Sequence, residues 1–408
     1  MFIAEDTVFG KMINHILEIV EKNKNEFPND SGRYKLSFLP FTINILLGII
    51  RGIGSISLLI TEIGTSDDTE SVKASKSMYS EAFVRYNPEL FRFLFYQLLL
   101  CLDFMAIPDI RHLGQFMLVD GSLFPAVSSM HWASYKSTAN AIKLNLSFNL
   151  NKMIPVEFLV KEGNFSEKKF LSRIIQEGIT YICDRGYISF AIFEEICEKG
   201  AFFIIRGKKN ICYSVEDTLK VTIPFRFNAF VSCAQDMIVR FGGDKSNKLY
   251  RIVSFTAMGE EYIIITNRSD LTTYEIIMLY AYRWQVELCF RFLKRTLNGI
   301  HLMTHDPKGI QIQFYLYMIA YLLLLTFRQE CETENAGNET AQNGNGCKES
   351  CGRSRNDAGR PYVCGLVSLI GKDLKKFWKI GIHWLTALRN SLLKRFDREI
   401  AINLSQFT

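Results

Sequence analysis

The chain has 408 residues, of which 48% are hydrophobic, so it can bury substantial cores in two or three domains. Its formal net charge of +6 permits an anionic partner but does not require one, because compact DNA-binding proteins often carry a larger local excess. The composition therefore indicates an ordinary globular protein, and charge alone does not decide its partner.

Three features exclude other classes of protein. Residues Met1–Asp6 lack the basic and apolar regions of a secretory signal, so we expect a cytoplasmic protein. The ten cysteines are scattered, which suits reduced thiols, and the pair Cys347 and Cys351 has no partners for a zinc site. The apolar run Phe314–Phe327 offers about 14 uncharged residues where a membrane span needs about 20, so we expect a buried helix.

Residues 1–105 are predicted to form a separate helical domain, because strand alternation is absent there. Its expected helical segments are Phe9–Lys22, Leu36–Ile63 and Glu89–Leu102. Basic residues are dispersed through the domain rather than clustered. A DNA-binding role and a plain helical bundle therefore both stay open.

From Gln115 onwards the pattern changes to strands that alternate with helices. The predicted elements are strands Phe116–Val119, Lys143–Leu150 and Ile154–Lys161, helix Ser166–Glu177, strand Thr180–Cys183, helix Phe190–Lys199 and strand Ala201–Arg206. The second and third strands are expected to pair as a hairpin. This order predicts a mixed α/β sheet.

Asp120 and Asp184 each close one of these short apolar strands. An aspartate near a glycine at a strand end is most often a turn former, and that role stays open for both. At the ends of neighbouring strands, however, two carboxylates would repel each other unless a cation neutralised them. The pair is therefore a candidate metal site.

Residues 210–267 are predicted to form a β-rich insertion. Its expected strands are Cys212–Val215, Lys220–Phe227, Asp236–Phe241, Leu249–Phe255 and Tyr262–Thr266. The insertion ends just before the most informative stretch of the chain.

That stretch is a predicted helix over Thr272–Asn298. Thr272 and Glu275 form a capping box at its start, and Asn298 with Gly299 forms the stop signal. The pattern Tyr-x2-Arg-x3-Glu-x6-Lys places four side chains on one stripe of the helix, opposite an apolar face. They are Tyr280, Arg283, Glu287 and Lys294. A solvated ion-paired face would show the same residues, so a functional stripe needs partners elsewhere.

The C-terminal part has three predicted segments. A helix is expected at Lys308–Gln329, followed by a disordered linker at 330–360 that is rich in Asn, Gly, Glu, Ser and Thr. The region 361–408 is expected to be helical. Its basic patch is most simply a solvated helix face and comprises Lys372, Lys375, Lys376 and Lys379.

Asp120-Gly-Ser, Asp184-Arg-Gly-Tyr and the stripe around Glu287 together resemble the DDE transposases of bacterial insertion sequences. The spacing is similar to the Tyr-Arg-Glu-Lys signature of the insertion-sequence-four branch, and Phe202–Asn210 resembles its strand before the insertion. The resemblance covers residues 105–328. It implies a ribonuclease H-like catalytic domain, which we assign to residues 106–209 and 268–328.

The resemblance also implies a mechanism, in which DNA is cut at the element's ends and the freed 3′ hydroxyls are joined to a target. Two Mg²⁺ ions about 4 Å apart would assist both steps, and Mn²⁺ is expected to substitute. The implied catalytic residues and metal ligands are Asp120, Asp184 and Glu287.

Further residues are implied to hold DNA. Arg283 and Lys294 would bind phosphates, and Tyr280 would contact the transferred strand. Arg206, Lys208, Lys209 and Arg291 are further candidates for DNA contact. The expected partners are double-stranded DNA, as element ends and target, and a second copy of the chain in a homodimer on paired ends; no membrane partner is expected.

Two other functions stay open. A ribonuclease H-fold nuclease without strand transfer would need the same three carboxylates. A domesticated DNA-binding protein that no longer cuts would not need them, so the intact triad argues against it.

Overall fold

The computed structural model describes residues 8–30, 32–65, 72–101, 108–137, 139–225, 231–257, 259–297 and 301–342. The chain divides into two compact units, each described here by itself. Among the described residues, a helical unit is drawn from 8–101 and 292–342, and an α/β unit from 108–291.

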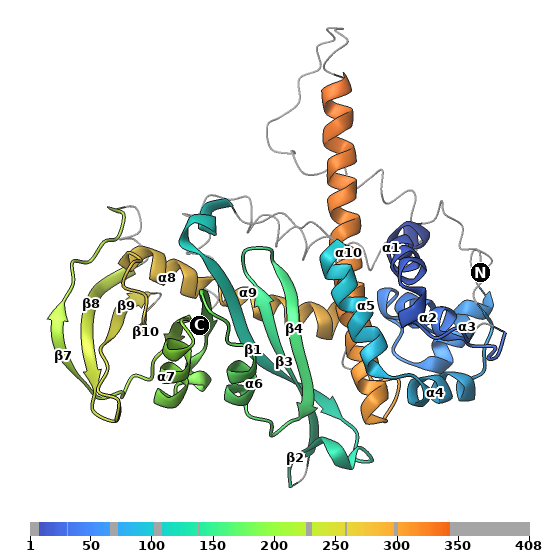
Figure 1. Ribbon diagram of the computed structural model, residues 1–408, viewed down its shortest axis with the longest axis horizontal. Coiled ribbons are helices and arrows are strands. Elements are labelled where there is room, and N and C mark those ends of the chain that lie inside the picture. Colours follow the sequence, from blue (N-terminus) through green and yellow to red (C-terminus); the bar gives the residue numbers. More distant parts are fainter. Residues whose placement is uncertain are drawn as a thin grey trace. The chain divides into compact units, whose positions relative to one another are not determined.

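The helical unit contains the N-terminal helices and the long helix α10 (Figure 1). Its elements are α1 (Val8–Lys22), η1 (Lys24–Glu26), α2 (Phe38–Ile50), α3 (Ile56–Thr65), α4 (Lys76–Arg85), α5 (Pro88–Cys101), the π-helical η6 (Phe292–Thr296) and α10 (Pro307–Gln342). Aromatic side chains fill its core: the ring of Phe41, for example, lies 5.0 Å from that of Phe83. The predicted helical character of this region is therefore confirmed for the described residues.

One predicted helical stretch, Leu36–Ile63, is wrong as a continuous element, because it is divided into α2 and α3. Gly52 has a φ of 70°, which favours glycine. The N–H of Gly52 donates to Ile49 O (3.0 Å) and that of Ile53 donates to Gly48 O (2.8 Å). These two bonds form a Schellman motif, which ends α2.

Helix α10 contains the apolar run that raised the membrane question. Its segment Pro307–Phe327 is long and apolar enough to cross a membrane, and it is the one such helix among the described residues. Most of that segment is buried within the fold, so the predicted buried helix is confirmed. The Tyr315 ring, for instance, lies 6.2 Å from the Phe95 ring of α5.

The structure differs from the predicted domain limits at the C-terminal side. The described residues from Phe292 to Gln342 group with the N-terminal helices, whereas we assigned 268–328 to the catalytic domain. The reason is the packing of α10 against α5 and α2.

The predicted disordered linker at 330–360 is also wrong over 330–342, where α10 continues. Extending a formed helix costs less than starting one, so a polar segment can continue a buried helix. The rest of the linker and the 361–408 region, with its basic patch, lie outside the described residues.

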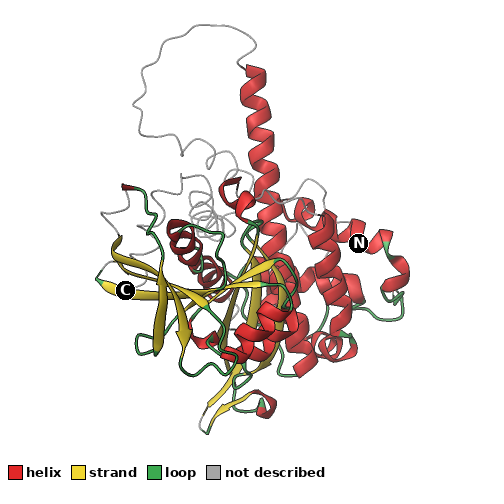
Figure 2. Cartoon of the chain, turned by 60° about the vertical axis from the view of Figure 1, so that its left-hand side comes forward, coloured by secondary structure: helices red, strands yellow, loops and turns green. Residues whose placement is uncertain are grey.

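The α/β unit is built on one sheet with helices packed against it (Figures 1 and 2). Its strands are β1 (Gln115–Ala126), β2 (Ser134–Lys136), β3 (Ala139–Asn149), β4 (Ile154–Glu162), β5 (Ile179–Cys183), β6 (Phe202–Arg206), β7 (Tyr213–Thr218), β8 (Val231–Phe241), β9 (Tyr250–Ala257) and β10 (Glu260–Thr266). Its helical elements are η2 (Pro108–Leu113), η3 (His131–Ala133), α6 (Glu167–Ile174), η4 (Arg185–Tyr187), α7 (Phe190–Glu198), α8 (Thr273–Ala281) and α9 (Trp284–Arg291).

The sheet is mixed, with strand order β2-β3-β1-β5-β6-β10-β9-β8-β7 and β4 paired to β3. Strands β1, β5 and β6 are parallel to one another, and the other pairs are antiparallel. The predicted mixed α/β sheet and the β3–β4 hairpin are confirmed.

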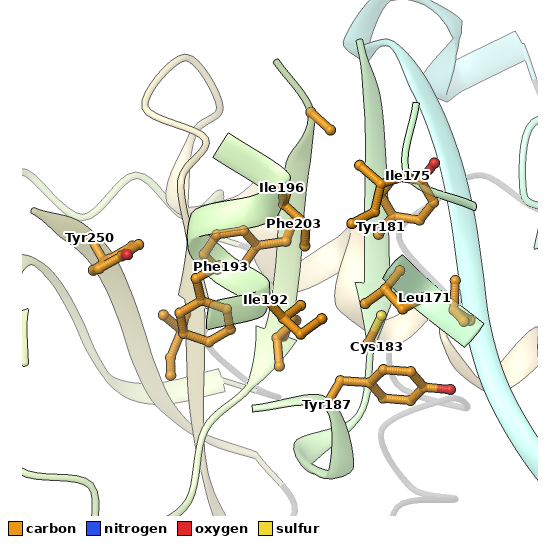
Figure 3. Close-up of a cluster of buried hydrophobic side chains, with 14 of the residues drawn as sticks. Leu171, Ile175, Tyr181, Cys183, Tyr187, Ile192, Phe193, Ile196, Phe203 and Tyr250 are labelled. Carbon is orange, nitrogen blue, oxygen red and sulfur yellow. The ribbon is translucent and has the colours of Figure 1, made fainter. Parts of the chain in front are cut away.

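An apolar cluster under this sheet fixes the parallel strands (Figure 3). The rings of Phe193 in α7 and Phe203 in β6 are stacked, with centroids 4.5 Å apart. Leu171 of α6 and Cys183 of β5 belong to the same cluster, and all four residues are fully buried. The cluster therefore holds α6 and α7 against one face of the sheet.

The β-rich region of residues 210–267 joins this same sheet through the pairing of β10 with β6. The predicted strand Lys220–Phe227 is wrong for residues 220–225, which are described and contain no strand. The backbone of this segment makes its hydrogen bonds to another element: Thr222 N–H donates to Thr273 Oγ1 (3.1 Å), and Tyr274 N–H donates to Thr222 O (3.1 Å). The segment therefore binds the start of α8 instead of a sheet edge.

Candidate active site

The two aspartates occupy equivalent places on the parallel strands β1 and β5. The last residues that these strands pair are Val119 and Cys183. Asp120 and Asp184 come directly after them, so both carboxylates lie where the parallel pairing ends. Carboxyl ends of neighbouring parallel strands are a common place for functional groups in such sheets.

Strand β1 does not end at Asp120, contrary to the sequence expectation. It continues to Ala126, because residues 121–126 pair with Asn140–Asn145 of β3. Asp120 is therefore held within a strand, where its neighbours on β3 fix its backbone. This position also argues against a simple turn-forming role.

Each aspartate accepts a hydrogen bond from a glycine that follows it. Gly121 N–H donates to Asp120 Oδ1 (2.8 Å), and Gly186 N–H donates to Asp184 Oδ1 (2.7 Å). Asp184 thereby caps the short helix η4. Both carboxylates are oriented by their own backbone.

The predicted single helix over Thr272–Asn298 is wrong, because it is divided into α8, α9 and η6. At the break, Arg283 N–H donates to Tyr280 O (3.0 Å) and Val286 N–H donates to Arg283 O (3.2 Å). These i-to-i−3 bonds tighten the chain locally. The predicted stop at Asn298 and Gly299 lies outside the described residues.

The start of this helical stretch is as predicted. Thr272 Oγ1 accepts from Glu275 N–H (3.2 Å), and Glu275 Oε2 accepts from Thr272 N–H (2.7 Å). The capping box is confirmed. The helix α8 is buried on nearly all sides rather than on one face.

Arg283 connects Glu287 to Asp120. Its Nη1 lies 3.4 Å from Asp120 Oδ2, and its Nη2 donates to Glu287 Oε1. The side chain of Arg283 is only 9% exposed, that of Asp120 16% and that of Glu287 31%. The stripe around Glu287 is therefore no solvated face, since a buried cation binds it to the sheet.

The charges of Asp184 and Glu287 both act on Asp120. The pKa of Asp120 is raised to about 7, mainly by burial; the negative charges of Asp184 and Glu287 add to the rise, and Arg283 opposes it. Burial alone would lower the pKa of Arg283, but the groups around it, including Asp120 and Glu287, raise it instead. Mutual repulsion among the carboxylates is thus partly balanced by one guanidinium.

The donor chemistry of this site fits a hard divalent cation, because carboxylate oxygens are the ligands that Mg²⁺ and Mn²⁺ prefer. A bound cation would offset both the burial and the neighbouring negative charges that raise the pKa of Asp120. Within the described residues, however, no group of three or more His, Cys, Asp or Glu side chains is arranged to hold a metal ion.

Arg206 occupies the same place on β6 as the aspartates do on their strands. Strands β5 and β6 pair last at Cys183 and Ile205, so Arg206 comes directly after the pairing. Its guanidinium lies 4.5 Å from the centroid of the Tyr262 ring and 3.4 Å from Glu260 Oε2. Asp120, Asp184 and Arg206 thus form a row across three neighbouring strands, at the end of their parallel pairing.

The other predicted DNA contacts differ in exposure. Lys208, Lys209 and Arg291 are exposed. Tyr280 is 1% exposed, and burial raises its pKa. Lys294 lies in η6, in the helical unit, and burial lowers its pKa.

Sequence reasoning overlooked Glu167 at the start of α6. Its carboxylate lies beside both Gly121 and Gly186, the glycines that orient the aspartates. The available signal was the glycine in each aspartate motif, which leaves room for a neighbour.

Comparison with known proteins assigns the family. A family model described as the transposase DDE domain matches residues 111–323, about half of the chain. The chain belongs to this transposase family. Its mixed sheet with flanking helices agrees with the ribonuclease H-like fold expected for such transposases, so the predicted fold class is confirmed.

The chain is also similar, at 23–27% identity, to individual proteins named as transposases. The chain is 27% identical to a protein of Sinorhizobium fredii named as a transposase, over 52% of this chain and 62% of that protein. It is 25% identical to one of Geobacillus stearothermophilus named for insertion sequence element IS5377, over 47% and 51%. It is 23% identical to one of Synechocystis named for insertion sequence element IS4SA, over 77% and 88%.

The first two matches thus span less than two thirds of those relatives. The family is the one expected from the aspartate motifs. The Tyr-Arg-Glu-Lys signature stays a prediction, because the matches name the family and not its residues.

Proposed function

We propose that this chain is a DNA transposase that cuts the ends of its insertion sequence and transfers the freed 3′ hydroxyls to target DNA. The observation that carries the proposal has two parts: Asp120 and Asp184 directly follow the paired ends of two neighbouring parallel strands, and Arg283 binds both Asp120 and Glu287. Membership of the transposase family supports it.

The three carboxylates would hold two divalent cations, Mg²⁺ or Mn²⁺. When bound, such ions supply an activated oxygen nucleophile and stabilise the leaving oxygen of the phosphodiester. Asp120 would be the ligand shared by the two ions, since it follows a strand next to that of Asp184 and shares Arg283 with Glu287. The glycine N–H groups keep Asp120 and Asp184 oriented throughout.

Arg283 has a second task in this proposal. Because it binds Asp120 and Glu287 together, it keeps the two ligands close while their charges are unbalanced. Its predicted direct contact with a phosphate stays a prediction, as does the predicted contact of Tyr280 with the transferred strand, because both side chains are buried in this structure.

Exposed cations are better placed to bind the DNA backbone. Lys208 and Lys209 follow β6, whose last residue Arg206 lies in the row of the aspartates, and Arg291 ends α9 four residues after Glu287. We propose them, with Lys294, as phosphate contacts. Two element ends must be joined in concert, so a homodimer on paired ends is the proposed assembly.

The decisive experiment uses pre-cleaved end DNA, made from inverted repeats that flank the coding region, with a target plasmid and Mg²⁺. Joined products are expected from the wild-type chain. Cutting without joining would favour a nuclease, and binding without cutting would favour a domesticated DNA-binding protein.

Variants of the three carboxylates test the assignment of residues. Asp120→Ala, Asp184→Ala and Glu287→Ala should each abolish cutting and keep DNA binding. Glu261→Gln, at an exposed position near the start of β10, is the matched control and should cut normally. Substantial Mg²⁺-dependent cutting by any of the three alanine variants would remove that residue from the site.

Salt dependence tests the phosphate contacts separately. Replacing Lys294 or Arg291 with alanine should weaken DNA binding and reduce the slope of log affinity against log salt by about one unit each. An unchanged slope would remove that residue from the contacts.

A further inference from the structure

Gly121 and Gly186, which follow the two aspartates, stand where a larger residue would collide with a neighbouring side chain. Neither Gly121 nor Gly186 has a positive φ, so backbone conformation does not require glycine at either position. Yet a Cβ atom on Gly121 would lie 2.7 Å from Glu167 Oε1 and 3.2 Å from its Cδ. A side chain at Gly121 would therefore displace Glu167.

The same carboxylate also approaches Gly186. A Cβ atom there would lie 3.4 Å from Glu167 Oε2 and 2.9 Å from Asp184 Oδ1. One side chain of α6 thus lies next to both glycines. These are the two glycines whose N–H groups bind the carboxylates of Asp120 and Asp184.

Glu167 is itself held in place. Lys143 Nζ, from β3, donates to Glu167 Oε1 (3.1 Å) and to Phe165 O (3.2 Å). The Lys143 side chain is 15% exposed and that of Glu167 25%, so water screens the ion pair less than it would at the surface. Glu167 is also the first residue of α6, where a helix favours a negative charge.

The charges of Glu167 and of the two aspartates act on the same neighbour, Tyr187. Burial raises the pKa of Tyr187, and Asp120, Glu167 and Asp184 each add to that rise. Glu167 therefore lies within electrostatic reach of the aspartate site, and Lys143 supplies its counter-charge.

We propose that Glu167, held by Lys143, is a positioning residue that fixes the orientation of Asp120 and Asp184 by packing on Gly121 and Gly186. It does not touch the reacting atoms. The inference rests on the proposed function, because the orientation of the aspartates matters only if they hold metal ions. Partners that orient metal ligands commonly change metal affinity by about 10- to 100-fold when they are removed.

The first test measures Mn²⁺ binding by calorimetry, with thermal unfolding as the check on folding. Glu167→Ala and Lys143→Met should each weaken Mn²⁺ binding by about 10- to 100-fold. The double variant should be no weaker than Glu167→Ala, because Lys143 acts through Glu167. Lys143→Arg keeps the positive charge that binds Glu167, so this variant should retain near wild-type affinity for Mn²⁺.

The second test needs no metal. Gly121→Ala should lower the melting temperature in the wild-type background and should lower it much less in Glu167→Ala, where the new methyl group has room. Gly242→Ala is the matched control, because nothing lies within 4 Å of its Cβ position and its φ is not positive. Equal losses from Gly121→Ala in both backgrounds would overturn the proposed packing.

The outcomes separate the two proposals. If the wild-type chain binds Mn²⁺ and cuts end DNA but Glu167→Ala binds Mn²⁺ equally well, the positioning role is wrong and the proposed function stands. If the wild-type chain does not bind Mn²⁺, both proposals fail. Weaker binding in Glu167→Ala at an unchanged melting temperature supports both.

Discussion

Arg283 and Asp120 form an ion pair between the break that separates α8 from α9 and the centre of β1, with Nη1 and Oδ2 3.4 Å apart. They are 163 residues apart in the sequence. Since Arg283 also binds Glu287, one buried cation connects two of the three proposed ligands. The sequence alone is compatible with a solvent-exposed helix face around Glu287, and this ion pair shows how that face is instead attached to β1 beside Asp120.

Replacing Arg283 with alanine should destabilise the protein, because two carboxylates would lose their shared cation. The expected loss is about 2–4 kcal/mol of unfolding free energy, measured by urea denaturation at pH 8 in EDTA. Arg291→Ala on the same stretch is the control; its side chain is exposed, so its loss should be within about 0.5 kcal/mol. Equal losses from the two variants would contradict a structural role for the Arg283 pairs.

A second buried ion pair should stabilise the loop that leads into α8. Arg251 donates to both oxygens of Asp236 (2.8 and 2.6 Å) and to the backbone oxygens of Arg268 (3.1 Å) and Leu271 (2.6 Å). Arg251→Ala would leave the buried Asp236 without its cation, so we expect a loss of about 3–5 kcal/mol in urea denaturation.

The matched control for Arg251 is Arg240→Ala on β8. Arg240 pairs with Glu216 at 3.2 Å, but the two side chains are 36% and 40% exposed. Exposed pairs contribute about 0–1 kcal/mol, so this variant should lose little. A loss for Arg251→Ala no larger than the control's would show that the buried network does not stabilise the fold.

The capping box at the start of α8 should be measurable by itself. Thr272→Ala removes the side-chain acceptor for Glu275 N–H and should cost about 1 kcal/mol of unfolding free energy. Ser166→Ala, at the start of α6, is the comparison, because Ser166 makes no side-chain capping bond. Indistinguishable losses from the two variants would be evidence against the box as a stabilising unit.

Glu195 of α7 should give stability a defined pH dependence. Burial would raise its pKa, but hydrogen bonds from Lys199 (2.8 Å) and Ser172 (2.6 Å) outweigh burial and lower the pKa below 4.5. A carboxyl whose pKa is lowered by folding stabilises the folded state above its unfolded pKa, and this contribution is lost as the pH falls through the folded pKa.

Glu195→Gln should therefore lose about 1 kcal/mol at pH 7, and its difference from the wild-type chain should shrink below about pH 4.5. Thermal unfolding from pH 3 to 7 measures this difference. Glu198→Gln, an exposed change at the end of the same helix, should show no such trend. A Glu195 difference that does not depend on pH would contradict the lowered pKa.

The sequence by itself determined the features that depend on local chemistry. Alternating apolar residues predicted β3 and β4, and Thr272 with Glu275 predicted the cap of α8, because each pattern involves neighbours within a few residues. The order of strands and helices predicted the mixed sheet, and the motifs at Asp120, Asp184 and Glu287 together predicted the family.

Only the tertiary structure decided what depends on distant partners. The break at Arg283 contains neither proline nor glycine, and its guanidinium binds a strand that lies far away in the sequence. Strand β1 continues beyond Asp120 because β3 provides hydrogen-bonding partners for its next residues. Helix α10 groups with the N-terminal helices because they bury its apolar surface. The place of Glu167 beside two glycines has the same origin, since a packing contact between α6, β1 and η4 leaves no periodic trace in the sequence.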